Sequence, residues 1–136
     1  MSRDVIFARL LGIRREPGGK LMQLGLTDQV QNHIGSMHAS AQFALAEVSS
    51  GDLLRRRFPS LQEQTVAVVR RAEIKYSKPV NSTLTAFPYI EKADEQKLLQ
   101  QMSSKGRALL AVHVELKSES GEIATYAVYH WFITKL

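Results

Sequence analysis

The 136-residue sequence contains no cysteine. This absence excludes disulfide scaffolds, thiolate zinc sites, iron–sulfur clusters and cysteine nucleophiles. It also contains no run of about 18 or more apolar residues, so we expect no transmembrane helix. The apolar stretch from Val5 to Ile13 is interrupted by Arg9 and follows the acidic Asp4, which does not resemble a signal peptide. We therefore expect a cytoplasmic protein that does not act at a membrane.

The composition is that of a globular protein. Hydrophobic residues make up 44% of the chain and charged residues 23%, which excludes disordered, fibrous and collagen-like chains. The length favours one domain over residues 1–136, with an N-terminal helix and loop at 1–19 and the main body at 20–136.

The chain is basic, with a formal net charge of +5. This charge admits a phosphate-bearing ligand, a nucleic acid or an anionic surface as partner. The basic clusters at 14–15, 55–57 and 70–71 are short and lack interleaved aromatic residues. Each is either solvated surface or a phosphate contact. We do not expect nucleic-acid binding, because no recognisable binding motif accompanies the charge.

Residues 37–57 are the most helical segment. They contain no proline, and Ala41, Ala44, Leu45 and Val48 recur at spacings of three and four. The segment is rich in alanine and serine, so another element can approach it closely. The sequence Phe58-Pro59 ends the helix.

The other segments are mostly strands. Hydrophobic alternation, β-branched residues and turn signals predict strands at 20–27, 65–76, 80–90, 107–116 and 123–133. Shorter helices are predicted at 5–12, with Asp4 as the expected cap, and at 92–104. Pro88 indicates a strand edge or a bulge. Antiparallel strands that follow one long helix predict an α+β fold with that helix on one face of the sheet. An exposed sheet face rich in valine, tyrosine and tryptophan predicts at least a dimer.

A polar loop leads into the long helix, and it carries the candidate site. The loop contains Asn32 and Gly35, and the helix is expected to begin at about His38. Unpaired N–H groups in a first helical turn can hold an oxyanion. Glu47 lies about two turns further on, among small and apolar residues, so we expect a partly solvated carboxylate of raised basicity.

The pattern Asn-x-x-Gly-x-x-His-small-small-x6-acid resembles the signature of hotdog-fold acyl-CoA thioesterases of the phenylacetate-pathway type. Asn32, Gly35 and His38 match it, and Glu47 falls nine residues after the histidine. The resemblance extends from Lys20 to Leu136, and it is closest to an uncharacterised bacterial branch of these proteins. It implies a hotdog fold, in which an antiparallel sheet wraps around one long central helix.

The resemblance also implies a reaction. The substrate is an acyl-CoA thioester, no separate cofactor is used, and coenzyme A enters as part of the substrate. Glu47 acts as general base or nucleophile, and Asn32 orients the water or the carbonyl. Amides near Ala39 and Ser40 stabilise the oxyanion, while Gly35 and His38 shape the substrate loop. The family's site is shared between subunits, which implies a homodimer or homotetramer.

Other interpretations stay open at this point. The family's Gly-Gly pair is replaced by Ala39-Ser40, and only Thr65 begins the next strand, where some members carry a helper Ser or Thr. These differences favour a non-catalytic hotdog protein that binds acyl-CoA or another acyl ligand.

The candidate residues also have structural interpretations. Glu47 can pair with Arg70 or Arg71, and Asn32 can act only as a loop cap. The spacing of the nearby histidines matches no helical zinc motif, so no metal site is expected. Tyr129 and Trp131 are interpreted as sheet or interface packing.

Overall fold

The computed structural model describes residues 6–136. One antiparallel sheet has the strand order β1-β2-β4-β5-β6-β3. The strands are β1 (Arg14–Arg15), β2 (Met22–Leu24), β3 (Thr65–Tyr76), β4 (Leu84–Tyr89), β5 (Arg107–Lys117) and β6 (Ile123–Lys135). The helices are α1 (Ile6–Leu11), α2 (Ala39–Arg57), α3 (Pro59–Gln62) and α4 (Lys92–Lys105), with a 3₁₀ turn η1 at Asp28–Val30.

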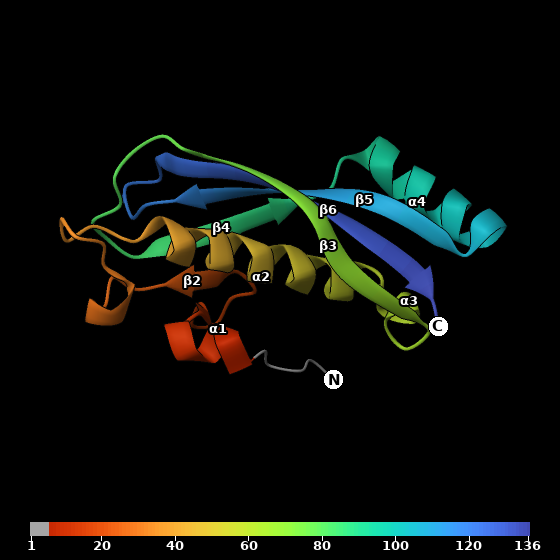
Figure 1. Cartoon of the computed structure of the whole chain (residues 1–136), viewed down its shortest axis with the longest axis horizontal. Coiled ribbons are helices and arrows are strands. Elements are labelled where there is room, and N and C mark those ends of the chain that lie inside the picture. The colour runs from red at the N-terminus through yellow and green to blue at the C-terminus, as the bar shows by residue number, and fades with distance from the viewer. Residues whose placement is uncertain (1–5) are drawn as a thin grey trace.

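Helix α2 lies along one face of the sheet, as Figure 1 shows. It contacts β2, β4, β5 and β6. The side chains that meet the sheet are small, and Ala41, Ala44 and Ala46 are almost completely buried. Small side chains bring the helix backbone close to the strands, so a curved sheet can surround the helix. This arrangement is the expected hotdog fold, with a sheet wrapped around one long helix.

The alternation of β5 places its apolar side chains against the core. Leu110, Val112, Val114 and Leu116 are all buried, as the period of two predicts. Tyr129 on β6 is completely buried, and Trp131 packs against both parts of the core. The interpretation of these two aromatics as sheet packing is confirmed. They do not contribute to an exposed face, whereas Val66, Val68 and Tyr76 of the edge strand β3 are exposed.

Several predicted boundaries differ from the observed ones. The strand predicted at 20–27 is confined to β2, because its neighbours are loops, and the strand predicted at 80–90 begins only at Leu84. Neither β1 nor α3 was predicted. Pro88 lies at a local edge, as expected: it pairs with Val114 of β5, and β2 ends before reaching it. The helix predicted at 5–12 is α1, while its expected cap Asp4 lies outside the described residues.

Helix α4 covers the part of β5 that β4 does not reach. Leu98 and Met102 are buried in one cluster with Leu110 and Val112. The helix ends at Gly106, which adopts a positive φ of 71°. Glycine is favoured there because an L side chain is strained in this conformation.

Candidate functional site

The loop before α2 is closed by its own asparagine. Oδ1 of Asn32 accepts hydrogen bonds from the amides of Ile34 (3.0 Å) and Ser36 (3.1 Å), and Nδ2 donates to Ser36 Oγ (2.7 Å). Gly35 has a φ of +82°, which the tight turn requires. Both polar atoms of the Asn32 side chain are therefore engaged within the loop, as the loop-cap interpretation expects.

His38 caps α2. Its Nδ1 accepts a hydrogen bond from the amide of Ser40 at 3.0 Å, and its carbonyl accepts from the amides of Ala41 and Gln42. Within the described residues, these bonds leave the amide of Ala39 as the first-turn donor with no acceptor. Ala39 is also an exposed residue. Of the two amides predicted to hold an oxyanion, that of Ser40 is bonded to the histidine side chain and that of Ala39 is not.

Glu47 lies in the middle of α2 and is partly buried. Burial raises the pKa of its carboxyl above the ordinary value. Within residues 6–136 the carboxylate forms no ion pair. The alternative that it pairs with Arg70 or Arg71 is wrong: Arg70 stacks on the ring of Phe132, and Arg71 pairs with Glu73.

Two tyrosines connect the helix to the sheet near Glu47. Tyr129 Oη donates to the carbonyl of Phe43 at 2.7 Å, and Tyr76 Oη donates to the carbonyl of Ala39 at 3.1 Å. Burial, and then the negative charge of Glu47, raise the pKa of Tyr129 above its ordinary value. Tyr129 therefore remains a neutral donor beside the glutamate at physiological pH.

The predicted site residues form two groups rather than one. Asn32, Gly35 and His38 lie at the beginning of α2 with Ala39 and Ser40, whereas Glu47 is eight residues beyond Ala39. Eight residues of α-helix span about 12 Å. Among the described residues, no three His, Asp or Glu side chains gather as metal ligands.

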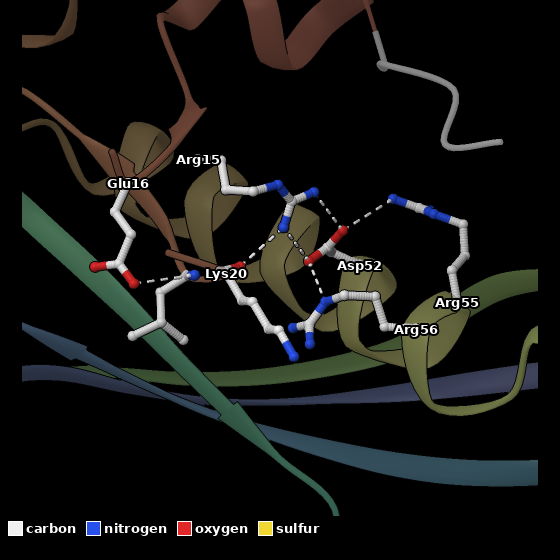
Figure 2. Close-up of polar contacts among 7 residues, drawn as sticks. Arg15, Glu16, Lys20, Asp52, Arg55 and Arg56 are labelled. Atoms are coloured by element: carbon white, nitrogen blue, oxygen red, sulfur yellow. Dashed lines mark hydrogen bonds and ion pairs between the residues drawn. The ribbon is translucent and has the colours of Figure 1, made fainter. Parts of the chain in front are cut away.

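The C-terminal part of α2 carries a buried charge cluster, drawn in Figure 2. Asp52, with a side chain that is 5% exposed, accepts two hydrogen bonds from Arg15 (2.9 and 3.0 Å) and one from Arg56 Nε (2.9 Å). Arg55 lies further away, at 4.0 Å. Burial raises the pKa of the Asp52 carboxyl, but the two bonded arginines outweigh burial and hold the pKa below its ordinary value.

The other basic clusters also make contacts within the chain. Arg57 forms a two-bond pair with Glu95 of α4. Arg15, Arg56 and Arg71 also form ion pairs, so each of the three basic clusters has at least one acidic partner within the described chain.

A cavity of about 210 Å³ lies beside the last turns of α2, and sequence reasoning did not find it. Its walls come from α2, α3, β3 and β6, and are mainly apolar. They are formed by Gly51, Leu54, Arg55, Phe58, Leu61, Gln62, Thr65, Ala67, Trp131 and Ile133. Trp131 Nε1 donates to Ser50 Oγ at 3.0 Å, and Ser50 Oγ donates to the carbonyl of Glu47 at 2.7 Å. The cavity therefore begins one helical turn beyond the glutamate.

The fold and this helix-borne carboxylate define a hotdog-fold protein. Residues 14–133 match the model of the family described as "Domain of unknown function (DUF4442)". The chain belongs to this family. No curated protein matches the sequence. No helix among residues 6–136 has the length and apolar character needed to cross a bilayer.

Solved structures share the fold at low sequence identity. PA5026 of Pseudomonas aeruginosa, a protein of unknown function, is 22% identical with a TM-score of 0.81, over 97% of this chain and 89% of that one. BH2602 of Bacillus halodurans, solved with CoA, is 20% identical with a TM-score of 0.73, over 96% and 77% of the two chains. A mutant of the thioesterase PA1618 of P. aeruginosa is 18% identical with a TM-score of 0.74, over 96% and 86%.

Proposed function

We propose that this protein is a thioesterase that hydrolyses an acyl-CoA thioester, with Glu47 as its catalytic carboxylate. The observation that carries the proposal is the state of Glu47: a carboxylate on the central helix that is partly buried, has a raised pKa and forms no ion pair with residues 6–136. A carboxyl left without a partner there lowers stability, so a functional role accounts for it. The fold is also that of a thioesterase and of a protein solved with CoA.

The reaction follows from the chemistry of the carboxylate. As general base, Glu47 takes a proton from water while the water oxygen adds to the thioester carbonyl. The C–S bond then breaks, the protonated Glu47 gives its proton to the leaving thiolate, and the products are the carboxylic acid and the thiol of CoA. Direct attack by the carboxylate forms an anhydride that water hydrolyses, with the same products. In both routes the carbonyl oxygen becomes negative and needs an N–H donor.

The donor and the carboxylate come from different protomers in this proposal. A reacting carbonyl must lie about 3 Å from both the oxyanion donor and the attacking group. The amide of Ala39 and Glu47 are about 12 Å apart along one helix, which is too far for a single carbonyl. A second copy that places its helix start beside Glu47 completes the site. His38 and Asn32 then act as positioning residues that hold this helix start.

Strand β3 is the surface on which we expect the two copies to meet. It is twelve residues long, it forms one edge of the sheet, and it pairs only with β6 among the described strands. Its Val66, Val68 and Tyr76 side chains are exposed. A long unpaired edge of this kind joins a second copy readily. Val68→Lys places a charge on this edge, so it should yield monomers by light scattering and abolish turnover together.

The test of the function is thiol release from a panel of acyl-CoAs, comparing the wild type with Glu47→Gln. Because the chain has no cysteine, a thiol-reactive dye reports only the product. We expect Glu47→Gln to lower kcat by at least a hundredfold, the contribution of a general base. Glu119→Gln, on the exposed hairpin turn, is the matched control and should leave turnover unchanged. Turnover that survives Glu47→Gln refutes the assigned residue.

A second candidate function is acyl-ligand binding without catalysis. It is favoured by the engaged side chain of Asn32 and by the bond from the Ser40 amide to His38, since both reduce the groups available to an oxyanion. Tight binding of acyl-CoA by a folded dimer that releases no thiol from any member of the panel establishes this function instead.

A further inference from the structure

The cavity beside the end of α2 is lined mainly by apolar side chains, and one of its lining residues has a buried polar atom without a hydrogen-bond partner among residues 6–136. Leu54, Phe58 and Ile133 are buried around it, and it measures about 210 Å³. At roughly 30 Å³ for each heavy atom, it holds a group of about seven atoms.

The buried polar atom is the side-chain Nε of Arg55. It makes no hydrogen bond with any part of the described chain. A buried donor without an acceptor is unfavourable, and a ligand that brings an acceptor oxygen removes this penalty. Among residues 6–136, Arg55 Nε is the buried side-chain atom in this state, and its residue lines the cavity.

The local charge favours an anionic acceptor. Figure 2 shows Asp52 surrounded by Arg15, Arg55 and Arg56. The carboxylate is bonded to two of these arginines at 2.9 to 3.0 Å and is only within 4.0 Å of Arg55. One negative charge against three positive charges leaves a surplus, and Arg55 is the member least tied to the carboxylate. A guanidinium in this position binds a ligand carboxylate well.

The cavity lies further along α2 than Glu47, toward the C-terminal end of the helix. Glu47, Gly51 and Arg55 follow one another at four-residue steps along α2, which spans about 12 Å from the first to the third. Gly51 has no side chain, which lets the ring of Trp131 pack against the helix at this point: a Cβ atom there would lie 3.3 Å from the indole. A chain that starts at Glu47 therefore passes Trp131 before it reaches Arg55.

We propose that this cavity receives the acyl group of the substrate, and that Arg55 binds a carboxylate at the distal end of that group. The preferred substrate class is thus a thioester of a dicarboxylic acid of medium length. This proposal rests on the proposed thioesterase function and specifies its substrate.

The experiment compares octanoyl-CoA with its ω-carboxylated analogue, suberyl-CoA. We expect the wild type to favour suberyl-CoA about tenfold in kcat/KM, the ratio that one charge-assisted hydrogen bond supplies. Arg55→Gln should abolish this preference. The matched control is Arg56→Gln, which loses a bond to the same Asp52 but does not line the cavity, and it should keep the preference. Equal kcat/KM for the two thioesters in the wild type, or a preference unchanged in Arg55→Gln, overturns the proposal.

Binding of two product-like amides separates this proposal from the proposed function. The monoamide of suberic acid, which carries one terminal carboxylate, and octanamide, which carries none, are titrated into the wild type, Arg55→Gln and Ala67→Leu by calorimetry. Ala67→Leu fills part of the cavity and should weaken both ligands, whereas Arg55→Gln should weaken only the carboxylate-bearing monoamide. If neither thioester is hydrolysed but the two ligands bind in this pattern, the thioesterase fails and the site stands. If both thioesters are hydrolysed and the two ligands bind all three proteins equally, the thioesterase stands and the site fails.

Discussion

Replacing Asp52 by Asn removes the negative charge that Arg15, Arg55 and Arg56 surround. The substitution keeps the shape of the side chain but loses three charge-assisted hydrogen bonds at 2.9 to 3.0 Å. The two bonds from Arg15 join α2 to β1, whereas the bond from Arg56 lies within α2, so the variant also loosens the contact between the central helix and the first strand.

The loss in the free energy of unfolding depends on how exposed the arginine partners of Asp52 are. Breaking a fully buried ion pair costs about 3–5 kcal/mol. The side chains of Arg15 and Arg56 are 40% and 34% exposed, so water replaces part of the lost interaction and we expect about 2–3 kcal/mol. At about 2.1 cal/mol/K of unfolding entropy for each of the 136 residues, each kcal/mol lowers Tm by about 3.5 °C. Asp52→Asn should therefore lower Tm by about 7–10 °C at pH 7.

The pH dependence provides the sharper test. The pKa of the Asp52 carboxyl is lower in the folded protein than in the unfolded chain, so its contribution is complete above the unfolded value of about 3.9. It is lost as the pH falls through the folded value. Urea unfolding of the wild type and Asp52→Asn should thus show a difference at pH 7 that shrinks below about pH 4.

The wider control is a double-mutant cycle. Arg15→Gln is combined with Asp52→Asn, and the pair should show a coupling energy of about 1 kcal/mol or more. A coupling energy near zero, or the same deficit at pH 7 and at pH 3, contradicts the assignment of this stability to the ion pairs.

Folding shifts the pKa of Glu47 in the opposite direction to that of Asp52. Its pKa is raised on folding, so its favourable contribution is present below the unfolded value and is lost as the pH rises through the folded value. Glu47→Gln should therefore unfold at higher urea than the wild type at pH 7, by on the order of 1 kcal/mol, and show no such gain near pH 3; a loss of stability at pH 7 contradicts the desolvated carboxylate. Tyr129→Phe removes the bond from a completely buried hydroxyl to the carbonyl of Phe43. It should cost about 1–2 kcal/mol in urea unfolding, and an unchanged midpoint rules out a contribution from this bond.

The sequence by itself determined the long helix, the long strands β3, β5 and β6, and the position of Glu47 on that helix. Apolar residues recur with a period of two along residues 107–116 and with spacings of three and four along 37–57. Both periods arise from local backbone geometry, so they can be recognised in the sequence before the fold is known. The start of the long helix near His38 is confirmed because a cap is a local feature. The expected rise in the pKa of Glu47 is also confirmed, since its small and apolar neighbours on the same helix already predict a partly buried carboxylate.

Only the tertiary structure decided the contacts between distant parts of the chain. Arg15 and Asp52 are 37 positions apart, and Ser50 and Trp131 are 81 apart, so strand order and register bring them together. The same holds for the cavity, whose walls come from four separate elements. The side chain of Asn32 was assigned to the substrate, yet its geometry places both polar atoms inside its own loop. A spacing motif states which residues are near in sequence, but the packed fold decides which donors stay open to a ligand.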